Sequence, residues 1–292
     1  MKRLHIVPEF NEANGVFVVA RMLAGEDGGR VVDAHDVSRA DIDAVDEVWV
    51  HGMWLPCEWR ACRMALRAGK RLVRMTHGSL SPIYLERQGK WKKRLVAPVE
   101  RRYFAKCDRV VLTGAWEEEW CRKWGVKGPF ETVDLKKFFD FGRVEHVERV
   151  ESGALHLLYL GRRHPLKGLE WLEKALRQLQ SKGVQFGFRV VSNAFGEEKE
   201  SIWEWCDVLV LPTLSENFGL VVAEALERGK RVITTDGAPA WGDGNDYGGR
   251  LIYLKGFLNG SDETRARLLK EAIGKVVPSR RTEGVVDKMT GD

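Results

Sequence analysis

The 292-residue chain lacks the features of a membrane-spanning or secreted protein. It contains no apolar run near the roughly 20 residues needed to cross a bilayer. The N-terminus, MKRLHIVPEF, meets Pro8 and Glu9 before any long apolar stretch, which is typical of a first strand rather than a signal peptide. The five cysteines form no CxxC pair, and the histidines complete no zinc-binding spacing. We therefore expect a cytoplasmic chain with reduced cysteines.

A dinucleotide-binding motif is missing, and a possible metal-binding motif is misplaced. No GxGxxG follows the first predicted strand, which disfavours a dinucleotide-binding enzyme such as a sugar-nucleotide epimerase. The one DxD sequence, Asp41 to Asp43, lies in a polar stretch before a strand, away from other candidate site residues. We therefore expect no metal site and no cofactor.

Positive charge is concentrated in one segment. The net charge is +5, but residues 87–107 carry eight basic residues and one acid, Glu100. Leu95, Val99 and Tyr103 are spaced by four in this segment, which predicts a helix. Such a basic helix can lie on an anionic membrane surface or bind a phosphorylated ligand. The alternative is a solvated helix with a buried apolar stripe. Because no nucleic-acid motif accompanies the charge, we expect no nucleic-acid partner.

Short β-branched runs alternate with helical stretches along the whole chain. This alternation predicts βαβ units and parallel sheets. The pattern restarts after a polar segment at residues 140–153, so we expect two doubly wound α/β domains, residues 1–145 and 146–292. The second domain should be short, because little chain separates the strands predicted at 186–191 and 207–211. The predicted strands are 4–7, 47–51, 71–76, 109–113, 155–160, 186–191, 207–211 and 231–235, and the predicted helices are 16–23, 58–68, 115–124, 169–180, 220–228 and 263–276.

The strongest candidate site follows the strand VLVLPT. The segment Ser215–Leu220 joins this strand to a helix, and free N–H groups at a helix N-terminus favour an anion. Carboxylates near such a site accept hydrogen bonds from hydroxyls, so Glu216 and Glu224 are candidates to hold sugars at the two ends of a nucleotide diphosphate. The alternative is that Glu216 caps the helix and Glu224 is solvated.

A second loop follows the strand LHLLYL. In GRRHPLKG, glycines flank a basic loop in which Arg162 can bind phosphate through two hydrogen bonds and Lys167 can add a point charge.

Together the segments YLGRRHPLKGLEWLEKAL and LPTLSENFGLVVAEALERGKRVITTDGAPAW resemble the nucleotide-binding domain of family 4 glycosyltransferases, which have the GT-B fold. The resemblance implies that Arg162 and Lys167 neutralise the donor diphosphate. It also implies that Glu216 contacts the donor sugar and Glu224 the ribose. The expected donor site is completed by Asn217, Phe218, Gly219 and Leu220.

Three elements of the first half follow predicted strands in the same way. THGS, containing His77 and Gly78, is similar to the family's His-Gly element, in which the histidine lies close to the reacting sugar. A turn with an ordinary surface histidine is the alternative. HGMW, beginning at His51, resembles an HGxW element of family 4 enzymes that build bacterial surface polysaccharides. Asn14 and Gly15 stand where the family often has a Gly-Gly turn. Together with His51 and Gly78 they are the expected acceptor-side residues, although packing is an equal alternative for His51.

The resemblance implies a metal-independent, retaining transfer of a sugar from a nucleotide-diphosphate donor to a hydroxyl of a glycan or lipid-linked acceptor, as in polysaccharide or lipopolysaccharide biosynthesis. Glu216, His77, Arg162 and Lys167 are the expected catalytic residues. Residues 87–107 are the expected contact with the inner face of the membrane. The alternative function is a non-catalytic sugar-nucleotide or glycan-binding partner of another transferase.

Overall fold

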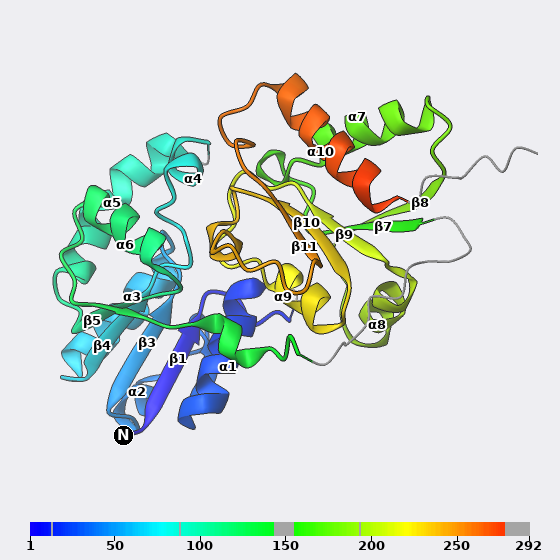
Figure 1. Ribbon diagram of the computed structural model, residues 1–292. Helices are drawn as coiled ribbons and strands as arrows, with labels where there is room; N and C mark the ends of the chain where they lie inside the picture. The colour runs from blue at the N-terminus through cyan, green and yellow to red at the C-terminus, as the bar shows by residue number, and fades with distance from the viewer. Residues whose placement is uncertain (13, 88, 143–154, 193, 278–292) are drawn as a thin grey trace, which may run out of the picture.

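Two parallel β-sheets, each flanked by helices, make up the computed structural model (Figure 1). It describes residues 1–12, 14–87, 89–142, 155–192 and 194–277. The expected interdomain segment at 140–153 therefore lies almost entirely outside the described residues. The two sheets confirm the predicted pair of doubly wound α/β domains and the GT-B fold class.

The first sheet has six strands in the order β2-β1-β3-β4-β5-β6. All its pairings are parallel, and β3 is buried over its whole length, as expected for a sheet covered on both faces. The strands are β1 (Arg3–Val7), β2 (Arg30–Asp33), β3 (Glu47–His51), β4 (Arg71–Met75), β5 (Arg109–Leu112) and β6 (Phe130–Thr132). The helices are α1 (Gly15–Asp27), α2 (Arg39–Asp43), α3 (Pro56–Arg67), α4 (Pro82–Arg87), α5 (Lys90–Phe104) and α6 (Ala115–Trp124).

The second sheet has five parallel strands in the order β11-β10-β9-β7-β8. They are β7 (Leu155–Leu160), β8 (Phe186–Val191), β9 (Val208–Leu211), β10 (Arg231–Thr235) and β11 (Leu251–Leu254). The helices are α7 (Leu169–Gln180), α8 (Gly196–Trp205), α9 (Leu220–Glu227) and α10 (Asp262–Val276). In each sheet the strand order reverses beside the first strand, at β1/β3 and at β7/β9. Loops that leave these strands at their carboxyl ends border the ligand crevice of such folds.

Every strand and helix that the sequence predicts is present, with bounds that differ by a few residues. Among the strands and α-helices, six were not predicted: β2, α2, α4, β6, α8 and β11. The segment between β8 and β9 holds more structure than expected, because α8 occupies most of it. No further strand lies there among the described residues.

Helices α1 and α9 belong to different domains and pack against each other at the domain interface. Figure 1 shows the two helices side by side. One hydrophobic cluster contains Val19 and Leu23 of α1 together with Leu158, Phe218 and Val222 of the second domain. The domains therefore share buried apolar surface where the two crevices meet.

Helix α5 confirms the predicted basic helix but corrects its buried stripe. Leu95 is 81% exposed and Val99 36% exposed, so the alternative with a buried stripe at these positions is wrong. The buried residues are Glu100 and Phe104. Glu100 forms a fully buried ion pair with Arg74 at 3.1 Å. The one acid of the basic segment therefore anchors the helix, while its cations other than the partly buried Lys93 face solvent.

Candidate functional site

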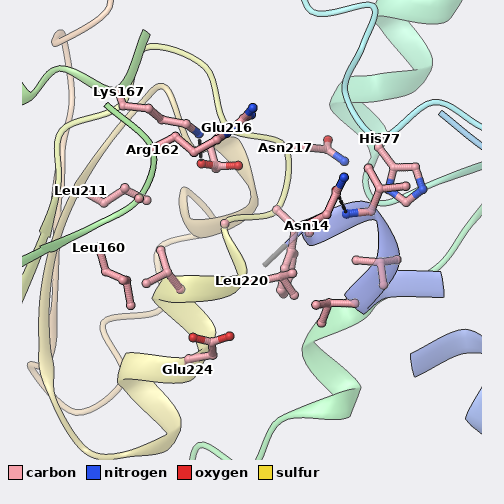
Figure 2. Close-up of a pocket in the computed structure, with 18 of the residues that line it drawn as sticks. Asn14, His77, Leu160, Arg162, Lys167, Leu211, Glu216, Asn217, Leu220 and Glu224 are labelled. Carbon is pink, nitrogen blue, oxygen red and sulfur yellow. Dashed lines mark hydrogen bonds and ion pairs between the residues drawn. The ribbon is translucent and has the colours of Figure 1, made fainter. Parts of the chain in front are cut away.

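A pocket of about 340 Å³ lies between the two domains (Figure 2). The first domain supplies the start of α1, His77 and Thr113, and the second supplies the loops after β7 and β9, Lys199 of α8 and the first turns of α9. The predicted site residues that line it are Asn14, Gly15, His77, Arg162, Lys167, Glu216, Asn217, Phe218, Gly219, Leu220 and Glu224.

The loops after β7 and β9 are joined by backbone contacts. The N–H of Leu214 donates to the carbonyl of Leu166 at 2.7 Å. Gly168 has φ +69°, and a Cβ added there would lie 2.0 Å from the carbonyl oxygen of Pro212. Only glycine allows this approach. The packing of the two loops brings Lys167 next to Glu216, 49 residues further along the chain.

Lys167 and Glu216 form an ion pair at the pocket wall. Figure 2 shows Arg162 beside this pair. The Arg162 residue is exposed, and its guanidinium has no ion-pair partner among the described residues. Burial lowers the pKa of His164 in the same loop, and the charges of Arg162 and Lys167 lower it further. The loop is therefore a positive region, and Arg162 is its cation that lines the pocket without an ion-pair partner among the described residues.

Two helix N-termini open on the pocket. Helix α9 begins after Gly219 (φ +77°), and among the described residues no side chain caps it. Its first amides are therefore available to an anion. Asn14 caps α1, since its Oδ1 accepts from the N–H of Val16 at 3.0 Å. The helices touch here, because a Cβ on Gly15 would lie 3.5 Å from Cδ1 of Leu220.

Glu224 lies further along α9 and points into the same pocket (Figure 2). Its side chain is 18% exposed, and Lys199 Nζ lies 2.8 Å from its carboxylate. The alternatives in which Glu216 caps the helix and Glu224 is solvated are both wrong. Each carboxylate instead faces the pocket with a lysine beside it.

His77 forms the opposite wall. It follows β4 with φ +49°, and Glu117 of α6 fixes the loop by accepting from Thr76 Oγ1 at 2.5 Å and from the N–H of Gly78 at 2.8 Å. Burial lowers the pKa of His77 to about 3, so its ring is neutral at physiological pH. The alternative of an ordinary surface histidine is wrong.

Gly78 and His51 do not line the pocket in the part of the chain that the structure describes. Gly78 packs against Asn217 of the second domain, because a Cβ added to it would lie 2.8 Å from Asn217 Cβ. His51 is fully buried behind His77, and its Nδ1 lies 2.9 Å from His77 Nε2.

Sequence reasoning missed Lys199, Glu12 and Ser192 in the pocket wall, and Glu117 behind it. Glu117 carries a weak sequence signal, because an acid in the first turn of a helix is favourable next to its N-terminus. Nothing in the sequence around the other three marks them, since each reaches the pocket only through the packing of α8, of the residues after β8 or of the loop before α1.

Neither a metal cluster nor a membrane span is seen among the described residues. No group of three or more His, Cys, Asp or Glu side chains there could hold a metal ion. The two acids of the DxD sequence serve α2, where Asp41 forms a capping box with Ser38 and Asp43 pairs with Arg39 at 2.9 Å. No described helix is long and apolar enough to cross a bilayer.

Comparison with protein-family models matches both halves of the chain. Residues 7–133 match the glycosyl transferase 4-like domain, and residues 144–254 match the glycosyl transferases group 1. The chain belongs to the glycosyltransferases. The family resemblance that the sequence motifs carried is thereby confirmed. No curated protein sequence matches this glycosyltransferase significantly.

Solved structures of similar fold cover nearly the whole glycosyltransferase. Anabaena Alr3699/HepE in complex with UDP-glucose aligns with a TM-score of 0.62 and 13% identity over 95% of this chain and 91% of that chain. Sucrose-phosphate synthase from Thermosynechococcus elongatus aligns with a TM-score of 0.64 and 13% identity over 94% and 90%. The UDP-forming α,α-trehalose-phosphate synthase from Burkholderia vietnamiensis aligns with a TM-score of 0.59 and 11% identity over 94% and 91%. At these identities the likeness shows the fold.

Proposed function

We propose that this glycosyltransferase moves a sugar from a nucleotide-diphosphate donor to a hydroxyl of a glycan or lipid-linked acceptor, with retention of configuration and without a metal ion. The observation that carries the proposal is the pair Lys167–Glu216, set beside Arg162 at the uncapped start of α9 and facing His77. Cations, a helix N-terminus and a carboxylate meet there in one pocket of about 340 Å³.

Each of these groups has a role in the transfer. The bond between the sugar and the diphosphate breaks, and negative charge develops on the departing phosphate. Arg162, Lys167 and the amides of α9 stabilise that charge, which is greatest in the transition state. Three cationic or partly positive groups supply the charge that a metal ion supplies elsewhere. Glu216 accepts hydrogen bonds from donor sugar hydroxyls, and Glu224 accepts them from the ribose.

A uridine nucleotide is the donor we propose to test first. HepE, whose fold this chain shares, has been solved with UDP and with UDP-glucose. The placement of Glu216 and Glu224 in one pocket also suits a nucleotide sugar. They are separated by eight positions that span the loop and the first turns of α9, so they can contact opposite ends of a nucleotide sugar.

The acceptor is proposed to be anionic and close to a membrane surface. On α5, Trp91 is 76% exposed and Leu95 81% exposed, next to the cations Lys92 and Arg94. Exposed apolar and aromatic side chains with flanking cations suit an anionic lipid interface. The adjoining α4 reaches the second domain, since Tyr84 packs against its core. An acceptor held at α5 is therefore close to the domain interface.

The test is incubation of the purified protein with UDP-, GDP- and ADP-sugars and a panel of glycan and lipid-linked acceptors, with and without EDTA. We expect release of the nucleoside diphosphate from one donor class, unchanged by EDTA, and a product with the anomeric configuration of the donor by NMR. Binding without release would favour the non-catalytic partner. Inversion, or activity only with added metal, would contradict the corresponding part of the proposal.

A further inference from the structure

Three histidines lie in a diagonal row across the first sheet. His5 is in β1, His51 ends β3 and His77 follows β4. The register pairs His5 with Trp49, and His51 lies two residues after Trp49 in β3. It likewise pairs His51 with Met75, and His77 lies two residues after Met75. Residues two apart on a strand share a face of the sheet. The row starts inside the domain and ends at the pocket.

Hydrogen bonds join the three rings to each other and to one carboxylate. Nε2 of His77 lies 2.9 Å from Nδ1 of His51, and Nε2 of His51 lies 3.0 Å from Nδ1 of His5. Nε2 of His5 lies 3.1 Å from Oδ2 of Asp27, the last residue of α1. His5 and His51 are fully buried. His77 Nδ1 has no hydrogen-bond partner among the described residues, and His77 is the one ring of the three that lines the pocket.

The contacts of Asp27, at the buried end of the row, stabilise its carboxylate in the ionised form. Arg3 Nη1 lies 3.1 Å from its Oδ2, and the N–H of Gly29 donates to its Oδ1 at 2.9 Å. Burial opposes ionisation, but the contacts with His5, Gly29 and Arg3 together lower the pKa of Asp27. Gly29 also leaves space for the contact, because a Cβ there would lie 3.0 Å from His5 Cδ2.

While His5 is neutral, this arrangement determines the direction of every bond in the row. A carboxylate only accepts, so His5 must carry its proton on Nε2. A neutral His5 then accepts at Nδ1 from Nε2–H of His51, and His51 accepts at Nδ1 from Nε2–H of His77. His77 is left with a bare Nδ1. Burial holds the pKa of His51 well below its usual value, and a proton on His77 or His5 lowers it further, so the middle ring is neutral.

We propose that His51, His5 and Asp27 are positioning residues that make His77 a hydrogen-bond acceptor toward a substrate hydroxyl, and that uptake of one proton reverses both histidine–histidine bonds while His5 still donates to Asp27. The proposal rests on the transferase function of this pocket. When a proton binds Nδ1 of His77, its Nε2 proton passes to Nδ1 of His51, and the Nε2 proton of His51 passes to Nδ1 of His5. The charge then resides on His5 beside Asp27, while His77 has become a donor.

No other charged group around the row accepts a hydrogen bond from His5 among the described residues, because each has its own partners. Glu47 pairs with Arg3 and Arg109, Glu58 accepts from the N–H of Leu55, and Glu117 holds the Thr76–Gly78 loop. Across the pocket the charged groups are Arg162, Lys167, Lys199, Glu216 and Glu224.

The test is ¹⁵N NMR of histidine-labelled protein over a pH titration, which requires no substrate. Near neutral pH we expect the proton on Nε2 and a bare Nδ1 for His51 and His77. On acidification the proton should move to Nδ1 of both rings at one common pH. Asp27→Asn removes the anion that stabilises charged His5, so the reversal should move to lower pH by about one unit or more. The control is Asp207→Asn in the other domain, where Asp207 Oδ2 lies 3.6 Å from Nδ1 of His156. This substitution should not change the pH of the reversal.

A double variant separates the row from a general loss of structure. In His51→Gln the middle ring is gone, so Asp27→Asn should no longer change the state of His77. Separate titration of His51 and His77, a proton on His77 Nδ1 near neutral pH, or an unmoved reversal in Asp27→Asn would overturn the proposal. The NMR measurement does not depend on turnover. Absence of transferase activity would therefore contradict the proposed function without contradicting the hydrogen-bond directions inferred for the histidine row. In active protein, the KM for the sugar donor should rise as pH falls through the reversal.

Discussion

The two walls of the pocket differ in where they keep their charge. On the second-domain wall, Lys167 pairs with Glu216 and Lys199 with Glu224, and all four line the pocket. On the first-domain wall, His77 is neutral, and the anion that orients it, Asp27, lies beyond two further rings. Partly exposed ion pairs can exchange partners when a charged ligand binds. Buried neutral rings instead act through the direction of their hydrogen bonds.

The second-domain side of the pocket, with Lys167, Glu216, Lys199 and Glu224, is called the charged wall below. Activity should be more sensitive to a single neutral substitution in this wall than to one on the first-domain side. Glu216→Gln keeps the size of the side chain but removes the carboxylate that accepts from the donor sugar and pairs with Lys167. Loss of a charged hydrogen bond of this kind should lower kcat about 100-fold. UDP affinity should hold within about 3-fold, because Arg162 and Lys167 remain. Steady-state kinetics with the active donor measure this, and an unchanged kcat would remove Glu216 from the site.

The contact between the walls can be broken at Gly78. Gly78→Ala should lower activity about 10-fold, because its Cβ would meet Asn217 and push the domains apart. Gly69→Ala is the matched control, since its φ of +65° is similar and no described atom lies within 4 Å of the added Cβ. Both should lose about 1–2 kcal/mol to backbone strain, but only Gly78→Ala should lose activity. Equal losses of activity would contradict an interdomain contact at this point.

The second carboxylate of the charged wall should affect donor binding alone. Glu224→Gln should raise the KM for the donor about 10-fold with kcat unchanged, because a ribose contact is the same in the ground state and the transition state. Glu227→Gln, one turn further along α9 and outside the pocket lining, should leave both parameters within about 2-fold. A fall in kcat for Glu224→Gln would instead place this residue near the reacting bond.

The smallest effect is expected outside both walls, on α5. Lys92→Gln should weaken binding to anionic vesicles about 5-fold, because each cation near such a surface contributes about 1 kcal/mol. Lys182→Gln, equally exposed in the second domain, is the control. Vesicle sedimentation measures both, and equal weakening would mean that net charge rather than α5 drives the binding. UDP affinity should not change in either variant.

The charged wall is the part that the sequence predicts best. Arg162, Lys167, Glu216 and Glu224 belong to two contiguous motifs that each follow a buried strand, so local pattern and topology suffice to place them. His77 was predicted for the same reason. The short elements β2, α2 and α4 were missed because they are too brief to show a period.

The hydrogen-bonded row of histidines could not be predicted from the sequence, for a different reason. His5 and His51 lie in two strands and His77 follows a third, and only the register of these strands places the three rings at hydrogen-bond distance. Asp27 adds the end of a helix to the same face. Its one sequence signal is weak: an acid at a helix C-terminus is unfavourable with respect to the helix dipole, which indicates a partner elsewhere.

The central claim, that the charged wall binds a nucleotide diphosphate, is tested most directly by titrating UDP into three proteins by calorimetry. Arg162 lines the pocket, whereas Arg163, next to it in the same exposed loop and with the same charge, does not. The account predicts that UDP binds the unaltered protein and Arg163→Ala with affinities within about 2-fold of each other. Arg162→Ala should bind at least about 10-fold more weakly, because it loses a charged contact to phosphate. Equal affinity of the two variants, or no binding of UDP, GDP or ADP to any of the proteins, would contradict it.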